Sequence, residues 1–474
     1  MSLLPETEFI SCPYCGEQLE IVVDISVEEQ SYIEDCYVCC RPISLSVVVD
    51  DLGGVVSVVA RDENECLVKE LERGDFMEYL LEDITVIDAA TFLAGPGAST
   101  ILSDFGANII KIEPPAGDTY RSLVGSYPVP YHWLLTSRNK KSLALDLTKD
   151  AGQELMHRMI TKADVLTTNF LDRQLRRYKL QYETVKEINP RIIYAHISGY
   201  GREGPEVERR AFDITAWWAR SGMMEFVRDQ GQTPLASAPG MGDHSTATAF
   251  FGAIMTGLYR REKTGEGSFV STSLAANGVW ANGMALQGVV AGNDLGAHRQ
   301  EKGWVNPLNA CYCTSDGQYL VLAIINTGRE YPKLCSALGQ EIWLEDERFN
   351  NVKEMYRNRT AFQDLVQKII GEMSFDEVSQ RLDEQGITYG IVQKMADVLD
   401  DEQLRAAGIV IETGDSTGDY NLTINSPINV KEAKKKQPVR APDIGADSLQ
   451  VLRSLDFEEE YIQELISSDV VVAG

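Results

Sequence analysis

The sequence lacks the features that mark a membrane or secreted protein. Its 474 residues hold no run of the roughly 18–20 uncharged apolar residues that a membrane helix needs. The first residues, MSLLPETEFISCPYCGE, include neither a basic region nor an apolar run, so we expect no secretory signal and a reducing, cytoplasmic location. Basic residues are also scarce, with 44 Lys and Arg against 71 Asp and Glu and a formal net charge of −27. Such a charge repels polyphosphate, so we expect neither a nucleic-acid nor a membrane partner.

Common catalytic motifs are missing too. The sequence has no GxGxxG, GxxxxGK[ST], GxSxG or HExxH pattern, and the Gly/Pro loop at 91–100 is only a weak candidate for a phosphate-binding loop. These absences argue against a dinucleotide fold, a P-loop enzyme, an α/β-hydrolase and a zinc protease.

Acidic residues and cysteines gather instead near the N-terminus. Residues 1–82 contain 19 acidic and 4 basic residues, and six of the nine cysteines precede residue 67. This shift in composition predicts a small module over 1–62, joined by a charge-rich linker over 63–82 to a larger body.

Two CxxC pairs in this module have the spacing of a structural zinc site. Cys12 and Cys15 form the first pair, and Cys36 and Cys39 form the second after twenty intervening residues. Strand-like segments surround the pairs, which predicts a zinc ribbon. All five histidines lie outside the module, so the ligands would be four thiolates and the zinc structural, with Cys40 able to replace Cys39. Disulfides or buried free thiols are the alternative. The segment also resembles the small bacterial CPxCG proteins.

The body alternates between strand-like and helix-like segments. Strands are expected at 84–88, 108–113, 142–147, 164–170 and 191–198, with helices between them, of which 150–162 is the clearest. This order predicts βαβ units and an α/β fold with a largely parallel sheet. Ligands of such sheets bind beyond the carboxyl ends of the strands, which directs attention to the loops after 88, 113, 170 and 198.

Several segments of the body stand out, in this order: LEDITVIDAATFLAGPGAST, RNKKSLALDL, INPRIIYAHISGYGREGP, the AFD of 211–213, GDHSTATAFFGA and REKTGEGSFVSTSL. Together they resemble the class III CoA-transferases, the CaiB/BaiF family that includes formyl-CoA transferase. The resemblance implies a Rossmann-like large domain over 83–290 completed by 426–474, and a smaller α/β domain over 305–425. It also implies a homodimer of interlocked rings, in which CoA is a co-substrate passed from an acyl-CoA donor to a carboxylic acid acceptor.

The resemblance further implies an aspartate nucleophile, expected at Asp213. The residue precedes an apolar helical stretch, where backbone N–H groups favour an anion, and Phe212, Trp217 and Trp218 could exclude water. Taken by itself, an aspartate at a helix start is more often a plain N-cap. The implied reaction passes through an aspartyl anhydride and an aspartyl-CoA thioester and needs no metal.

The same resemblance implies a CoA site formed by Leu145, Asn169, Phe170, Arg177 and Tyr178. A solvated helix charge is an equal alternative for Arg177. Two other functions remain open. An α-methylacyl-CoA racemase would have GHD in place of AFD and would need another base, for instance His196. An inactive CoA-binding scaffold would use the zinc ribbon to recruit a partner.

Overall fold

The chain consists of two compact units. The computed structural model describes residues 6–25, 27, 29–49, 55–61, 78–123, 129–301, 305–415 and 417–474. Contacts divide the chain into Met1–Glu78 and Tyr79–Gly474, which we describe separately. Most of the expected linker, residues 62–77, lies outside the described residues.

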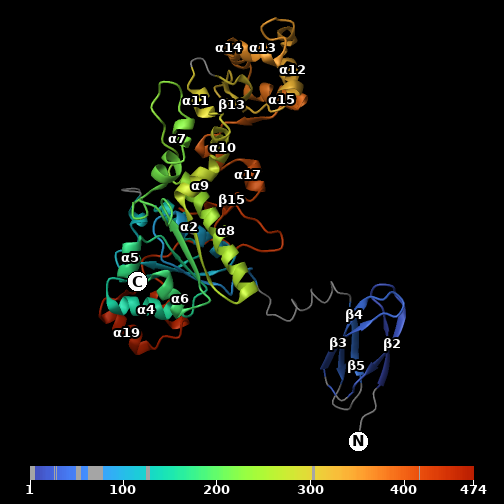
Figure 1. Cartoon of the computed structure of the whole chain (residues 1–474), viewed down its shortest axis with the longest axis vertical. Coiled ribbons are helices and arrows are strands. Elements are labelled where there is room, and N and C mark those ends of the chain that lie inside the picture. Colours follow the sequence, from blue (N-terminus) through green and yellow to red (C-terminus); the bar gives the residue numbers. More distant parts are fainter. Residues whose placement is uncertain are drawn as a thin grey trace. The chain divides into compact units, whose positions relative to one another are not determined.

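The N-terminal unit is made of short antiparallel strands (Figure 1). One sheet pairs β1 (Glu6–Ser11) with β2 (Gln18–Val23), and the other has the order β3 (Glu29–Asp35), β4 (Pro42–Val49), β5 (Val55–Arg61). Buried and exposed side chains alternate along β2 and β4, so one face of each sheet supplies the core.

A seven-stranded sheet forms the centre of the body, in the order β11-β10-β9-β6-β7-β8-β17. Its strands are β6 (Thr85–Asp88), β7 (Asn108–Glu113), β8 (Lys141–Leu145), β9 (Val165–Thr168), β10 (Ile193–Ser198), β11 (Ser268–Ser273) and β17 (Val471–Val472). All neighbours are parallel except β17, which runs antiparallel to β8 at the edge. The predicted α/β fold with a largely parallel sheet is confirmed.

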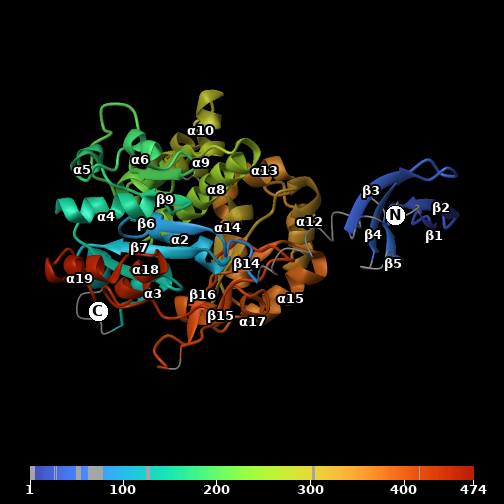
Figure 2. The ribbon, with the colours of Figure 1, turned by 90° about the horizontal axis from the view of Figure 1, so that it is seen from below.

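Helices cover both faces of this sheet (Figure 2). One face packs against α4 (Asp150–Ile160), α6 (Tyr182–Ile188), α18 (Ser448–Ser454) and α19 (Glu459–Ser467). The other packs against α2 (Ala94–Asp104) and the long α8 (Met241–Thr264). Because α18, α19 and β17 come from the last residues of the chain, the C-terminal segment completes the domain that begins at β6.

A smaller lobe has a hydrophobic core of its own, which runs from Leu308 to Ile387. Its antiparallel sheet consists of β12 (Cys311–Cys313), β13 (Tyr319–Leu322) and β14 (Tyr389–Ile391). Its helices are α12 (Thr327–Ala337), α13 (Val352–Arg357), α14 (Arg359–Ile370) and α15 (Phe375–Gln385), grouped at one end of the body in Figure 1.

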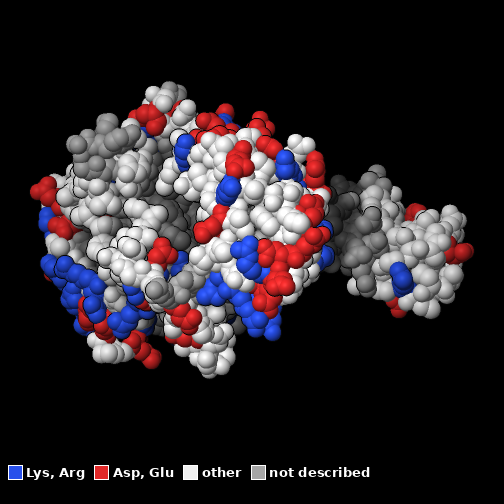
Figure 3. All heavy atoms as spheres, turned by 90° about the horizontal axis from the view of Figure 1, so that it is seen from above, with Lys and Arg blue, Asp and Glu red and all other residues white. Residues whose placement is uncertain are grey.

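Shorter elements connect these parts. They are η1 (Thr119–Ser122), α3 (Tyr131–Ser137), α5 (Asp172–Arg177), η2 (Ile214–Ala219), α7 (Met223–Phe226), α9 (Leu274–Ala281), α10 (Gly283–Val290), α11 (Leu295–Arg299), η3 (Pro307–Asn309), η4 (Glu341–Leu344), α16 (Met395–Val398), α17 (Glu402–Ala406), β15 (Val410–Glu412) and β16 (Leu422–Ile424). Among the helices in the described residues, none is both long enough and apolar enough to cross a bilayer. On the face shown in Figure 3, basic side chains lie in groups interleaved with acidic ones.

Candidate active site and metal centre

The strand order reverses between β6 and β9, and the loop that follows β6 is clamped at this point. The side-chain amide of Asn169, just after β9, donates to the carbonyl of Thr91 at 2.9 Å. Its oxygen accepts from the backbone N–H of Thr91 at 3.0 Å. Since ligands of parallel sheets bind where the strand order reverses, this clamp lies where a substrate site is expected. Asn169 thus holds the loop with both ends of its amide.

A buried ion pair also holds the loop after β6 in place. Lys140 lies 2.9 Å from Asp88 at the end of β6, and its ammonium also donates to the carbonyl of Pro96 at 2.7 Å. Burial would raise the pKa of Asp88, but the nearby charges of Lys140 and Lys111 outweigh it and hold that pKa below its usual value. The start of α2 is therefore tied to the sheet by charge as well as by packing.

Asp213 lies at the N-terminus of η2, a short helix of π geometry. Its Oδ1 accepts from the backbone N–H of Ile214 at 2.7 Å, and the residue is 8% exposed. Its Oδ2 is buried without a hydrogen-bond partner in the described residues. Burying a carboxylate oxygen without a hydrogen-bond partner costs free energy. Proteins accept this cost most often at functional sites.

A second carboxylate, Asp243, lies close to Asp213. Asp243 is in the first turn of α8, where the helix dipole favours a negative charge. Burial and, after it, the charge of Asp213 raise the pKa of Asp243 from its ordinary 3.8 to about 7. The close approach of α8 to η2 depends on Gly242, because a Cβ atom there would lie 2.7 Å from the side chain of Trp217 in η2.

Sequence reasoning singled out Asp213 and missed Asp243. The signal was present in GMGD, two glycines and an acid at the start of a helical segment. A glycine that permits close packing of two helices brings the residues beside it close together.

Aromatic rings border the two carboxylates; we call Phe92, Tyr120, Tyr131, His132 and Phe212 the ring cluster. The Phe92 centroid lies 5.5 Å from that of Phe212 and 5.8 Å from that of Tyr120, and Tyr120 lies 5.5 Å from His132. Burial, followed by the charge of Asp243, raises the pKa of Tyr120, so this ring is close to that carboxylate. Phe212 and Tyr131 are about half exposed, at 54% and 52%, and offer an apolar surface beside the pair.

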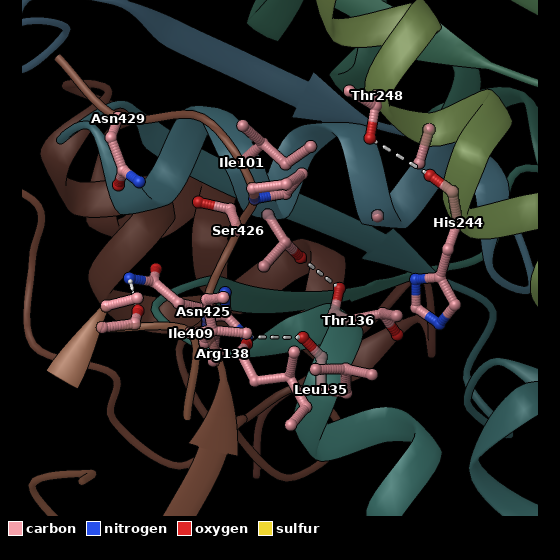
Figure 4. Close-up of a pocket in the computed structure, with 17 residues that line it drawn as sticks. Ile101, Leu135, Thr136, Arg138, His244, Thr248, Ile409, Asn425, Ser426 and Asn429 are labelled. Carbon is pink, nitrogen blue, oxygen red and sulfur yellow. Dashed lines mark hydrogen bonds between the residues drawn. The ribbon is translucent and has the colours of Figure 1, made fainter. Parts of the chain in front are cut away.

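His244, the residue after Asp243, lines a cavity of about 690 Å³ (Figure 4). Its walls come from α2, α3, α8 and the segment around β15 and β16, and they include Ile101, Leu135 and Ile409. Arg138 lines it as well, but its guanidinium is buried and paired with Asp104 at 2.7 Å. The cavity is therefore mainly apolar.

The residues expected to bind CoA lie along one edge of the sheet. Phe170 follows β9, and its ring packs edge-on against Tyr178 with centroids 5.4 Å apart. Arg177 ends α5, is exposed, and lies 5.8 Å from the ring of Tyr178. Leu145, at the end of β8, is 1% exposed, so its side chain belongs to the core.

The histidine considered as an alternative base is not at this surface. His196 is 2% exposed in β10, and its Nε2 lies 2.9 Å from the carbonyl oxygen of Phe170. Burial lowers its pKa to about 4, so the ring stays neutral near pH 7. We read it as part of the packing beneath the loop after β9.

In the N-terminal unit, Cys12, Cys15, Cys36 and Cys39 have all four sulfurs within 4.8 Å of one another. The Sγ atoms of Cys12 and Cys39 are 3.8 Å apart, as are those of Cys15 and Cys36. A disulfide would need about 2.05 Å, whereas sulfurs around a tetrahedral zinc with bonds of about 2.3 Å are separated by roughly 3.8 Å. The four thiols therefore fit a zinc ion.

Cys40 is not part of this group. Its backbone N–H donates to the Cys36 carbonyl, and its φ of 53° is the left-handed turn that Gly16 adopts after the first pair. The side chain is exposed.

Comparison with known proteins assigns both units. The sequence profile of CoA-transferase family III matches residues 81–448. The chain belongs to this family. A second profile, described as a bacterial zinc ribbon domain, matches residues 10–61, so the family III body carries a zinc ribbon domain at its N-terminus.

Similar proteins include CoA-transferases that act on different acids. The chain is 31% identical to an (R)-2-hydroxy-4-methylpentanoate CoA-transferase of Clostridioides difficile, over 83% of this chain and 99% of that one. It is 30% identical to a cinnamoyl-CoA:phenyllactate CoA-transferase of Clostridium sporogenes, over 81% and 96%. It is 29% identical to a succinyl-CoA:glutarate CoA-transferase of Mus musculus, over 82% and 90%.

Among solved structures, a CaiB/BaiF family protein from Brucella suis superposes with a TM-score of 0.70 at 27% identity, covering 80% of this chain and 100% of that one. The body is thus a family III CoA-transferase, a member of a family of enzymes that act on acyl-CoA and acid substrates.

Proposed function

We propose that the enzyme transfers CoA through a covalent aspartyl intermediate formed at the Asp213–Asp243 pair. A carboxylate attacks the thioester carbonyl of the donor, forming a mixed anhydride and releasing CoA thiolate. The thiolate attacks the aspartyl carbonyl, which releases the donor acid and leaves an aspartyl-CoA thioester. The acceptor carboxylate then attacks this thioester and expels the thiolate. Finally, the thiolate takes the acyl group from the second anhydride and regenerates the aspartate.

The proposal assigns the attack to Asp243, with Asp213 as its neighbour. Asp213 remains the position expected from the sequence, but one of its oxygens is held by Ile214 and the other is buried. Asp243 is less buried and has a pKa raised to about 7. A carboxylate with a raised pKa is a stronger base and nucleophile once ionised, and about half of it is ionised at pH 7. One observation carries the proposal: the two carboxylates lie close together, and their surroundings differ. Asp213 is buried with one oxygen held by Ile214, whereas Asp243 is less buried and has the raised pKa.

We propose that CoA lies across the carboxyl edge of the sheet, between the 305–425 domain and the 83–290 domain that 426–474 completes. Asn169 holds the loop beneath it, while Phe170, Arg177 and Tyr178 contact it. Leu145 lies three strands from β9, about 14 Å away at the usual strand spacing, a span that a molecule as long as CoA can cover. Arg177→Ala should raise KM for acyl-CoA about tenfold to a hundredfold, as expected for one charge-assisted contact.

A homodimer of interlocked chains is proposed on the basis of an apolar surface formed by α9 and α10. Trp280, Met284 and Val290 are 86%, 84% and 80% exposed, and α10 has no buried residue among its eight. Large apolar side chains this exposed on two consecutive helices are rarely left in water, and a second copy of the chain is their proposed partner.

The four cysteines are proposed to hold one structural zinc. Four thiolates complete a tetrahedral shell and leave no position for a substrate, so the ion would stabilise the N-terminal unit without taking part in the transfer.

The test is to incubate the protein with an acyl-CoA, trap with hydroxylamine and map the modified peptide. A hydroxamate on Asp243 supports the assignment, and one on Asp213 returns the attack to the position expected from the sequence. Solvent deuterium at the α-carbon of an α-methylacyl-CoA without a hydroxamate would establish the racemase alternative. CoA binding with neither reaction would establish the scaffold.

A further inference from the structure

The surroundings of the carboxylate pair restrict which acids the site accepts. Family III relatives act on acids as different as phenyllactate and glutarate, so membership alone leaves the acid open. Two properties of the described residues bear on it. One is the chemistry of the surface beside the pair, and the other is the charge that a substrate would meet there.

The surface beside the pair is formed by the ring cluster. Phe212 directly precedes Asp213 and is half exposed, and its edge-to-face partner Phe92 follows the clamped loop. The buried Tyr120 lies behind them and close to Asp243. An acyl group attached to either aspartate would therefore extend over aromatic rings, which favour apolar and aromatic groups.

The charges near the pair are unfavourable for a second carboxylate on the substrate. Two acidic groups already face each other, and the basic side chains packed beneath the loop after β6 are engaged in ion pairs with other acidic groups, while Arg209 and Arg220 pair with Glu206 at the surface. The pairs beneath the loop are Arg138–Asp104, Lys140–Asp88, Lys111–Asp118 and Arg121–Glu113. Burial lowers the pKa values of His132 and His244, so these rings are neutral near pH 7 and add no positive charge. A dicarboxylic acid would place its far carboxylate among like charges and rings.

We propose that this enzyme acts on monocarboxylic acids with a branched or aromatic apolar side chain, which packs against Phe92, Tyr120 and Phe212. The inference rests on the proposed function, because it requires an acyl group to be attached at the carboxylate pair.

The experiment measures hydroxamate formation in a single turnover, which reports on the donor without any acceptor. Three probes are compared: 4-methylpentanoyl-CoA, 3-phenylpropanoyl-CoA and glutaryl-CoA. We expect the second-order rate constants of the first two to exceed that of glutaryl-CoA at least tenfold. An equal or faster reaction of glutaryl-CoA overturns the inference and leaves the covalent mechanism intact. Labelling by none of the three overturns the mechanism, and the inference with it.

Variants then test where the side chain packs. Phe212→Ala should lower the rate constant for 3-phenylpropanoyl-CoA about tenfold to a hundredfold, the factor expected when a ring loses its apolar contact. The rate for glutaryl-CoA should change much less, so the preference between the two collapses. Phe9→Ala removes a somewhat more exposed ring, 66% exposed in the N-terminal unit against 54% for Phe212, and should leave both rates unchanged.

The cavity that His244 lines is the competing location for the substrate side chain. Ile409 lines it and is 43% exposed, so Ile409→Trp can reduce the cavity without burying new volume in a core. We expect this variant to keep the wild-type preference. If Ile409→Trp changes the preference and Phe212→Ala does not, the ring cluster is not the side-chain site and the proposal is overturned.

Discussion

Asp213→Asn should change the pH dependence of the transfer reaction rather than abolish it. The substitution keeps an oxygen that can accept from Ile214, so the start of η2 stays capped. It removes the negative charge that, together with burial, raises the pKa of Asp243 to about 7. The pKa of the attacking group should therefore fall while the site keeps its shape.

The size of the effect follows from the two causes of the raised pKa. With a pKa of about 7, Asp243 is about 1% ionised at pH 5, so the wild-type rate there should be about a hundredth of its value above pH 8. A like charge at close range raises a carboxyl pKa, but here it is the smaller of the two causes. Burial remains in the variant, so we expect the acidic limb of the pH–rate profile to move down by about 1 pH unit, less than half of the total rise above the ordinary 3.8.

The assay is the initial rate of acyl-CoA exchange at saturating substrates from pH 5 to pH 9, for the wild type, Asp213→Asn and Asp243→Asn. Asp243→Asn should be inactive at every pH. A wild-type rate that does not change between pH 5 and 8 would refute the reasoning. So would an Asp213→Asn variant whose rate falls at the same acidic pH as that of the wild type. An inactive Asp213→Asn beside an active Asp243→Asn would show that the two roles are exchanged.

Three further predictions concern parts of the molecule other than the carboxylate pair. Lys140→Met leaves Asp88 buried without its partner and should lower the free energy of unfolding by about 3–5 kcal/mol in a denaturant titration. The control Arg381→Met breaks an exposed ion pair on a helix and should lower it by less than about 0.5 kcal/mol. Trp280→Glu should convert the proposed dimer to monomers or unstable protein in sedimentation at micromolar concentration, and a wild type that sediments as a monomer would refute the proposed interface. Cys39→Ser should lower the zinc content below one ion per chain, whereas Cys40→Gly should retain the ion and slightly stabilise the turn; equal zinc loss in both would show that Cys40 is a ligand.

The central sheet could be predicted from the sequence because its strands are short, buried and bounded by polar or glycine-containing turns. The expected strand at 108–113 matches β7, and the expected helix at 150–162 matches α4 to within two residues. In both, the apolar pattern reflects burial against the same core, so local sequence and tertiary packing agree.

Other elements depend on contacts that no local pattern reveals. The helix α3 begins at Tyr131 after Pro130 without a side-chain cap, so its sequence carries no start signal. The strand β17 has two residues and exists because it pairs with β8, more than 300 positions earlier. Such elements are set by the surface against which they pack, which is known only once the sheet has formed.

In the candidate sites, too, some residues could be predicted from a local pattern and others could not. Cysteine spacing predicted which four thiols would meet, because each pair is held by its own tight turn and the strands between are short. The carboxylates are thirty positions apart and carry no spacing rule. Their meeting depends on Gly242, which lets α8 approach the ring of Trp217. Sequence reasoning therefore found Asp213 through the AFD motif of the family resemblance, and it missed Asp243, whose position depends on a glycine.

The effect of Asp213 on the pKa of Asp243 gives a physical reason for a second carboxylate beside the proposed nucleophile. An isolated exposed aspartate with a pKa near 3.8 would be ionised at pH 7 but weakly nucleophilic. Burial makes it more basic, and the buried charge of Asp213 raises its pKa further, so the ionised form has a high free energy before it attacks. Forming the anhydride neutralises one of two facing charges, which relieves the repulsion in the same step. Asp213 would thus contribute to the rate without bonding to the substrate.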